Sequence, residues 1–256
     1  MHLIVKAYSL KTNFHIITLS FFSLIMCNLC AAQVPDNEKK VIIASKILAE
    51  NISITTYDSA PEIEIKPFVY ITDGQKMIEN GTLDIIKELT IKGQIPKANY
   101  VFVSTIDAKT SQDKRNTYFF CNEKYMQFFE KELAPTIESQ LSRKLKPKER
   151  SLIGISFGGL NAVYFSGKTE LFQNYALLSP ITYPCKEALS SIAFSENENL
   201  NIFISTGKND AENYVGPLTQ LYKSKGYTVE NLETEGAHDF NNWNGQMEQM
   251  LNKLLK

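Results

Sequence analysis

The sequence predicts an α/β fold in which helices cover both faces of a mostly parallel central sheet. Three observations indicate this fold. Short apolar runs rich in β-branched residues alternate with stretches of helical periodicity. A Gly-x-Ser-x-Gly motif joins one apolar run to the helix that follows it. Polar residues suited to catalysis follow the last two apolar runs, at the edge where parallel sheets bind ligands.

The first part of the chain contains four predicted strands and one helix. Val41–Ile43 and Ile52–Thr56 are rich in β-branched residues and read as opening strands. Pro67–Ile71 and Tyr100–Ser104 are short apolar runs of the kind buried in parallel sheets. Between them, Ile78–Ile91 repeats its apolar residues at helical spacing.

The middle of the chain is more polar. Ile106–Phe119 reads as a long polar loop, and loops above strand ends commonly carry function. Asn122–Leu145 reads as a long amphipathic helix that Pro135 kinks or divides, because proline cannot donate a backbone hydrogen bond. The basic run Arg143–Arg150 is interpreted as a solvated loop and not as a binding patch.

Ser156 lies at the centre of the motif that organises the chain. Ser151–Ile155 is mostly apolar and predicts a buried strand, and a helix is expected after the motif, where Gly159–Tyr164 has small residues suited to close packing on a sheet. Glycines two residues before and after Ser156 suit a sharp strand-to-helix turn. The pattern predicts a nucleophile elbow, although a plain glycine-rich turn is the simpler alternative.

The alternation of strands and helices continues to the end of the chain, with no internal repeat or linker. The predicted elements are a strand at Tyr175–Leu178, a helix at Lys186–Phe194, a strand at Asn201–Ser205, a helix at Leu218–Lys225, a strand at Thr228–Leu232 and a helix at Phe240–Leu255.

Ser156, Asp210 and His238 occur in the chain order of the α/β-hydrolase triad. His2 and His15 belong to the predicted leader, so His238 is the one histidine of the mature chain, and it follows the last strand. We expect His238 to be the general base and Asp210 to orient it. Asn209, Glu212 and Asp239 compete with Asp210, but Asp239 adjoins the histidine, and adjacent side chains seldom meet in this way.

An oxyanion hole requires two backbone N–H donors. The amide of Phe157, directly after the nucleophile, is expected to supply one of them. The other is expected from Gly74 or Gln75, in the loop after the Pro67–Ile71 strand. Asp73 in the same loop is interpreted as a turn former and not as an acid or base.

Residues 1–32 read as a signal peptide, which leaves residues 33–256 as one domain. Lys6 and Lys11 precede the mostly apolar Phe14–Leu29, and cleavage is expected after Ala32. A retained membrane anchor is the alternative, but the apolar stretch is short for a span. The protein is therefore expected to be exported, either periplasmic or secreted, with no stable membrane span after cleavage.

Composition limits the partners of the mature chain. The whole chain carries a net charge of −1, and the leader holds two lysines and no acid, so the mature part is near −3. No nucleic-acid partner is expected. No cofactor is expected, and no cysteine or histidine cluster suggests a metal. Cys121 and Cys185 can close a disulfide in an oxidising compartment, although two unpaired cysteines are the favoured interpretation. The sequence does not determine the oligomeric state.

From about Pro67 onward, the chain resembles the putative esterase family of α/β-hydrolases. That family includes enterochelin and feruloyl esterases, acetyl-xylan esterases, S-formylglutathione hydrolase and the antigen 85 mycolyltransferases. The matching motifs are Tyr70–Gly74, Phe129–Pro135, Gly154–Leu160, Leu178–Pro180, Gly207–Asp210, Gly236–Phe240 and Trp243. The resemblance implies a serine ester hydrolase, and its motifs match the same triad of Ser156, Asp210 and His238.

The sequence departs from the family pattern beside Arg115. Relatives often place an acidic residue after this arginine, whereas here Asn116 follows it. Arg115, Tyr183 and Trp243 are candidates for contacting substrate, and a solvated loop arginine is the alternative for the first. The expected substrates are siderophore esters or hydroxycinnamoyl or acetyl esters of polysaccharide. An acyltransferase with the same triad and a non-catalytic binding protein of this fold are the other hypotheses.

Overall fold

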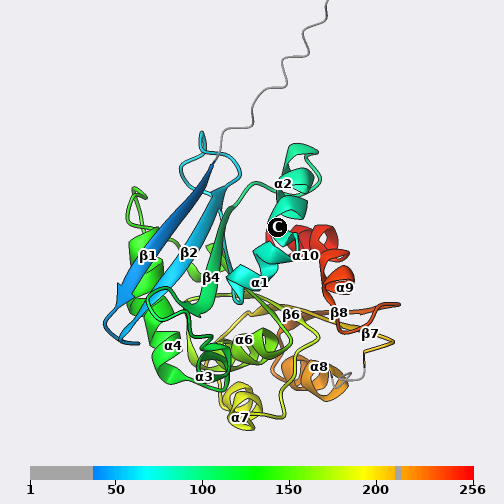
Figure 1. The fold of residues 1–256 in the computed structure, drawn as a ribbon. Helices are drawn as coiled ribbons and strands as arrows, with labels where there is room; N and C mark the ends of the chain where they lie inside the picture. Colours follow the sequence, from blue (N-terminus) through cyan, green and yellow to red (C-terminus); the bar gives the residue numbers. More distant parts are fainter. Residues whose placement is uncertain (1–36, 211–214) are drawn as a thin grey trace, which may run out of the picture. The chain divides into compact units, whose positions relative to one another are not determined.

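A computed structural model of the chain describes residues 37–210 and 215–256. The predicted leader lies outside these residues, as does Glu212. The core of the described part is an eight-stranded sheet with the order β1-β2-β4-β3-β5-β6-β7-β8 (Figure 1). The strands are β1 Glu38–Ser45, β2 Glu50–Asp58, β3 Phe68–Ile71, β4 Asn99–Asp107, β5 Arg150–Ile155, β6 Asn174–Leu178, β7 Asn201–Gly207 and β8 Thr228–Thr234.

The sheet is antiparallel at one side and parallel over the rest. β1 pairs with β2, and β2 with β4, both antiparallel, with a register shift in β2 between Ile52 and Ile54. β4, β3, β5, β6, β7 and β8 are parallel neighbours in that order. Because parallel strands end at the same edge, the segments after β3, β5, β7 and β8 converge there. The fold is that of the α/β-hydrolases, as the sequence predicts.

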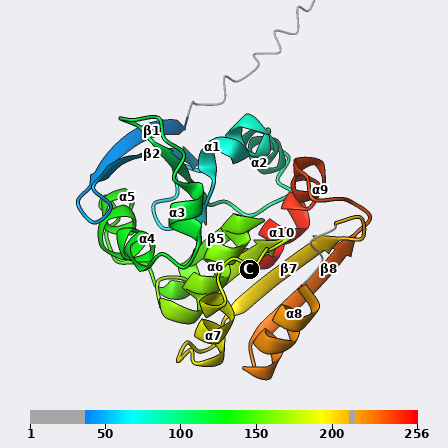
Figure 2. The same cartoon turned by 60° about the horizontal axis from the view of Figure 1, so that its bottom comes forward.

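Helices lie on both faces of the sheet, and each face has its own apolar core (Figures 1 and 2). One face carries α1 Gly74–Glu79, α2 Thr82–Ile91, α9 Phe240–Asn244 and α10 Met247–Leu254. The other carries α3 Arg115–Phe119, α4 Glu123–Phe128, a π-helical turn at Phe129–Leu133, α5 Ala134–Ile137, α6 Phe157–Lys168, α7 Glu187–Ala193 and α8 Val215–Ser224. None of the helices in the described ranges is long and apolar enough to cross a membrane.

Three predicted helical stretches are shorter or more divided than expected. The stretch at 78–91 begins earlier, at Gly74, and splits into α1 and α2 at Gly81, whose φ of 81° a helix cannot contain. The closing helix is divided into α9 and α10. The helix predicted at 122–145 is shorter: it runs without a gap from Glu123 to Ile137, changes to a π-helical turn at Phe129–Leu133 directly before Pro135, and is followed by turns. The predicted polar loop before it contains the short helix α3.

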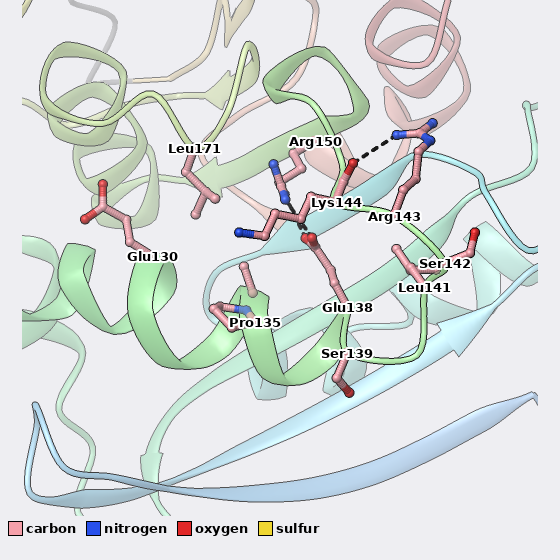
Figure 3. A pocket seen from close by; sticks show the side chains of 11 residues that line it. Glu130, Pro135, Glu138, Ser139, Leu141, Ser142, Arg143, Lys144, Arg150 and Leu171 are labelled. Carbon is pink, nitrogen blue, oxygen red and sulfur yellow. Dashed lines mark hydrogen bonds and ion pairs between the residues drawn. The ribbon is translucent and has the colours of Figure 1, made fainter.

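The basic run lies at the amino-terminal end of β5, opposite the end that carries Ser156. Arg143 and Lys144 are exposed, as predicted for a solvated loop. Arg150 is instead buried, because its guanidinium pairs with the Glu138 carboxylate at 2.6 Å. These residues line a surface cavity of about 620 Å³ (Figure 3). The cavity and its ion pair therefore lie away from the candidate site at the other end of β5.

Candidate active site

Ser156 occupies the sharp turn between β5 and α6. Its backbone has φ 54° and ψ −118°, a conformation that residues other than glycine rarely adopt. Its N–H donates to the carbonyl of Leu178 at 2.9 Å, and its carbonyl accepts from the amides of Leu160 and Ile181, each at 3.2 Å. These three backbone hydrogen bonds hold the strained residue in place at the edge of the sheet.

The glycines of the motif allow this turn to close. A Cβ on Gly154 would overlap the carbonyl group of Gly158, since β5 and α6 approach each other backbone to backbone. A Cβ on Gly158 would lie 2.7 Å from the hydroxyl oxygen of Thr72. The sequence motif therefore reflects a real lack of space around Ser156.

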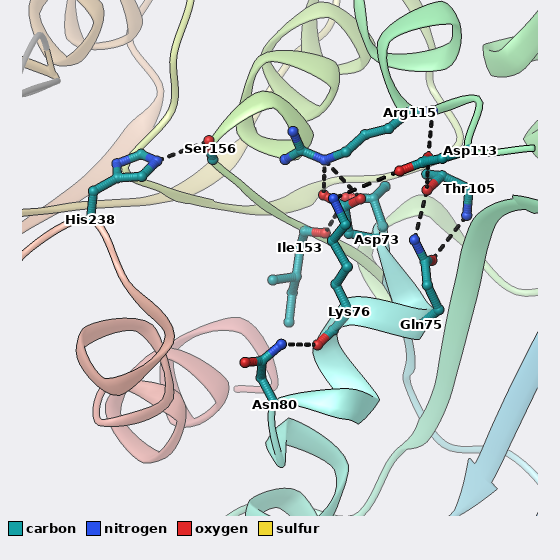
Figure 4. Close-up of polar contacts among 11 residues, drawn as sticks. Asp73, Gln75, Lys76, Asn80, Thr105, Asp113, Arg115, Ile153, Ser156 and His238 are labelled. Carbon is teal, nitrogen blue, oxygen red and sulfur yellow. Dashed lines mark hydrogen bonds and ion pairs between the residues drawn. The ribbon is translucent and has the colours of Figure 1, made fainter.

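The structure brings together the three side chains expected to form a triad. The distance from Ser156 Oγ to His238 Nε2 is 2.9 Å (Figure 4). On the other side of the ring, His238 Nδ1 lies 3.1 and 3.0 Å from the two carboxylate oxygens of Asp210. Asp210 is buried just after β7, and His238 follows β8. The three residues thus form one continuous chain of hydrogen bonds.

The competing residues have other partners. Asp239 accepts the N–H of Asn242 at 2.9 Å and caps the start of α9. The side-chain amide of Asn209 donates to the carbonyl of Glu235. Among the described acidic residues, Asp210 is the one whose carboxylate reaches His238.

The three amides expected to bind an oxyanion lie in the first turns of two helices. Phe157 begins α6, and Gly74 and Gln75 begin α1. First-turn amides have no intrahelical acceptor, so they remain able to donate to a ligand. The Gln75 side chain turns away to β4, where its amide nitrogen donates to the hydroxyl of Thr105 at 2.8 Å. The expected role of Gln75 in binding an oxyanion therefore rests on its backbone N–H and not on its side chain.

Asp73 and Arg115 form an ion pair beside these amides. Asp73 is 0% exposed and has φ 55°, so it does form the turn before α1, as expected. Arg115 Nε donates to both of its carboxylate oxygens, at 2.9 and 2.7 Å (Figure 4). Burial raises the pKa of Asp73 above its usual value, and the Arg115 guanidinium offsets part of that rise.

The sequence reasoning treated Asp73 and Arg115 separately and missed their pairing. Only an indirect feature of the sequence could have indicated this contact. One residue follows β3 and the other follows β4, and these strands are neighbours in the sheet. Strand order cannot be read from alternation alone, so the contact became visible only with the fold.

The remaining candidates for substrate contact lie in different surroundings. Tyr183 is 65% exposed in the segment after β6, where a ligand can reach it. Trp243 is only 5% exposed, and its ring centroid lies 4.9 Å from that of His238. Its indole N–H donates to the hydroxyl of Ser179 at 3.0 Å. A substrate contact by Trp243 is not supported, because the side chain instead packs against the imidazole.

Cys121 and Cys185 form a disulfide, with their Cα atoms 6.2 Å apart. The favoured interpretation of two unpaired cysteines is therefore wrong for this structure. The bridge joins the segment between α3 and α4 to the segment between β6 and α7. Both segments touch the elbow: Phe120 packs on Phe157, and Ile181 donates to the carbonyl of Ser156. In the described part of the chain, no group of three or more His, Cys, Asp or Glu side chains could hold a metal ion.

Comparison with known proteins yields one family and several structural neighbours. Residues 45–254 match the model of the family described as putative esterase. A curated relative is the endo-1,4-β-xylanase/feruloyl esterase of Xylanibacter ruminicola, which is 28% identical over 139 residues. That match covers 54% of this chain and 18% of the relative.

Among solved structures, the enterobactin esterase FES of Shigella flexneri is similar with a TM-score of 0.73 and 22% identity. The match covers 85% of this chain and 58% of that one. A ferulic acid esterase is similar with a TM-score of 0.69 and 17% identity over 85% of this chain and 97% of that one. At these identities the neighbours show a shared fold. This chain spans less than two thirds of the curated relative and of the enterobactin esterase.

Proposed function

Because this chain belongs to the putative esterase family, we propose that it is a serine carboxylic-ester hydrolase that works through an acyl-enzyme. The observation that carries the proposal is the hydrogen-bonded chain from Ser156 through His238 to Asp210. Serine is a weak nucleophile unless a base removes its proton, and this arrangement supplies a base and a group that orients it.

In the first step, Asp210 accepts a hydrogen bond from the Nδ1–H of His238. This tautomer leaves Nε2 free to take the proton of the Ser156 hydroxyl. The serine oxygen then attacks the ester carbonyl carbon. The charged imidazolium that forms is stabilised by the buried carboxylate, which lies within 3.1 Å of the ring.

The tetrahedral intermediate places negative charge on the former carbonyl oxygen. The amides of Phe157 and of Gly74 or Gln75 are proposed to donate to this oxyanion. They belong to the first turns of α6 and α1, where the helix dipole also favours negative charge. His238 then protonates the leaving alcohol, and the C–O bond of the ester breaks. Water, deprotonated by the same histidine, hydrolyses the acyl-serine and restores the enzyme.

The proposed substrates are siderophore esters or hydroxycinnamoyl or acetyl esters of polysaccharide. The support is the nature of the relatives, which include enterobactin esterase, ferulic acid esterase and a xylanase/feruloyl esterase. Such substrates suit an exported enzyme. We propose that residues 1–32 are a signal peptide and that the mature domain, residues 33–256, is periplasmic or secreted.

Hydrolysis of p-nitrophenyl acetate by the mature protein tests the mechanism. In Ser156→Ala and His238→Ala we expect kcat/KM to fall by about 10³-fold or more, because both groups act in the same proton transfer. Ser190→Ala, on the exposed face of α7, is the matched control and should keep wild-type activity. Equal rates in wild type, Ser156→Ala and His238→Ala, with all proteins folded by circular dichroism, would reject the serine mechanism.

A further inference from the structure

Arg115 has two hydrogen-bonding groups left over after its ion pair with Asp73. Both hydrogen bonds with the carboxylate come from Nε. Within the part of the chain that the structure describes, the terminal nitrogens Nη1 and Nη2 have no hydrogen-bond partner. The side chain is 16% exposed, so it is not sealed off from solvent. The unused N–H donors of this guanidinium, beside the candidate active site, can donate hydrogen bonds to an acceptor group of a ligand.

The unused end of Arg115 faces the nucleophile. Figure 4 shows the guanidinium pointing toward Ser156, on the side of the serine away from His238. Its central carbon lies 5.1 Å from the ring centroid of Phe157, the residue directly after Ser156, and 5.5 Å from that of Phe119. The guanidinium therefore packs against the side chain of the residue whose amide is a candidate oxyanion donor.

The side chain of Arg115 is preorganised for binding a ligand. Asp73 fixes Nε, and the two phenyl rings pack against the guanidinium, so little side-chain entropy remains to be lost when a ligand binds. Nη1 and Nη2 form a planar fork of N–H donors, which matches the two oxygens of a carboxylate. Because Asp73 balances the charge of Arg115, recognition would depend on these directed hydrogen bonds more than on net charge.

The position of Arg115 relative to His238 determines which part of a bound ester this arginine can contact. The leaving alcohol must depart beside His238 Nε2, which protonates it. Arg115 lies on the other side of Ser156, so it faces the acyl part of the ester, which stays bound to the serine.

We propose that Arg115 is a specificity-determining residue that binds a carboxylate in the acyl part of the substrate, so that the enzyme favours half-esters of dicarboxylic acids. The inference rests on the proposed function, because the role of His238 determines on which side of Ser156 the acyl part of the ester lies. It narrows the proposed substrates to esters whose acyl part carries a carboxylate, a feature that the triad does not specify and that plain acetyl and hydroxycinnamoyl groups lack. Asp73 is the positioning residue that holds the arginine.

Two esters of equal acyl length test this proposal. These are 4-nitrophenyl hydrogen glutarate, whose acyl end is a carboxylate, and 4-nitrophenyl pentanoate, whose acyl end is a methyl group. The test variant is Asp73→Asn/Arg115→Gln, which removes both charges together and leaves no unpaired buried carboxylate. Arg143→Gln is the matched control, since it removes an exposed arginine at the opposite edge of the sheet.

We expect wild type to favour the glutarate ester by about 10-fold or more in kcat/KM, as a bidentate charge-assisted pair would provide. In the double variant this ratio should fall about 10-fold, mainly through a higher KM for the glutarate ester, whereas Arg143→Gln should keep the wild-type ratio. An unchanged ratio in the double variant, or a parallel loss with both esters, would show that the pair only supports the fold of the site.

A binding measurement that needs no turnover separates this inference from the proposed function. Monomethyl glutarate is titrated into Ser156→Ala protein with and without the double substitution. We expect its Kd to be about 10-fold weaker without Arg115. Equal Kd values, or no binding to the arginine-containing protein, overturn the inference whether or not any ester is hydrolysed. Arginine-dependent binding in an enzyme that hydrolyses no ester would reject only the proposed function.

Discussion

At the scale of single residues, Asp210 is expected to act through His238 and not on the substrate. Its carboxylate accepts from Nδ1 and thereby keeps Nε2 ready to take the serine proton. Asp210→Asn would offer an N–H to the ring and favour the wrong tautomer. We predict that kcat for p-nitrophenyl acetate falls by about 10⁴-fold while KM changes little, because the binding surface is retained.

Asp239→Asn is the matched control for this prediction. It changes the same residue type beside the same histidine, but Asp239 caps α9, and asparagine caps a helix equally well. The control variant should therefore keep both activity and thermal stability. If Asp239→Asn loses activity and Asp210→Asn does not, the acid of the triad has been assigned to the wrong residue.

Candidate site residues could be predicted from the sequence where neighbouring residues, or the rarity of the residue type, single them out. Ser156 is marked by two glycines that the elbow needs, and His238 is marked by being the one histidine after the predicted leader. The Asp73–Arg115 pair and the burial of Trp243 depend on which strands are neighbours and on how α9 docks beside the site. Those are contacts between distant parts of the chain, and spacing along a single sequence does not contain them.

At the scale of elements, the elbow depends on the close approach of β5 and α6. A Cβ at Gly154 would overlap backbone atoms of Gly158, which cannot move aside as the end of a flexible side chain can. We predict that Gly154→Ala lowers the free energy of unfolding by about 3 kcal/mol, the upper range for overpacking, as measured by urea denaturation.

Gly245→Ala provides the comparison. Gly245 ends α9 with φ −63° and ψ −14°, a conformation that alanine adopts freely. Its Cβ would lie 3.2 Å from the carbonyl oxygen of Asn241, a tight but adjustable contact. We expect a change of less than about 1 kcal/mol. If both variants lose the same stability, the close approach of β5 and α6 does not explain the glycine in the motif.

Strands could be predicted more accurately than helices, for a physical reason. A buried strand must be apolar along its length, so its ends are visible as changes of composition, as in β3 and β6. A helix needs only one apolar face, and that spacing continues across a break when both pieces pack on the same core. α1 and α2 do so, which explains why Ile78–Ile91 read as one helix despite Gly81.

At the scale of the whole molecule, alternation of element types was enough to predict helices on both faces of a mostly parallel sheet. It was not enough to predict that β4 lies between β2 and β3. That order sets which loops meet, and it brings the segment after β4 to the elbow. The same segment leads into Cys121, so strand order also accounts for the disulfide that the sequence interpretation did not favour.

The Cys121–Cys185 disulfide is expected to stabilise the mature domain. It closes a loop across a sequence separation of 64 residues, and the chain-entropy model assigns about 4 kcal/mol to a loop of that size. We predict that Cys121→Ala/Cys185→Ala lowers the free energy of unfolding by about 2–4 kcal/mol in urea denaturation. Because the two bridged segments also contact Phe157 and the Ser156 carbonyl, kcat/KM should fall more steeply with temperature in the variant than in wild type.

Reductant provides the control, because it acts only where a disulfide exists. Dithiothreitol should lower the stability of wild type to that of the double variant and leave the double variant unchanged. Thiol titration of unfolded, unreduced mature protein should find no free cysteine, since Cys27 and Cys30 belong to the predicted leader. Two titratable thiols in protein exported to an oxidising compartment would contradict the bridge.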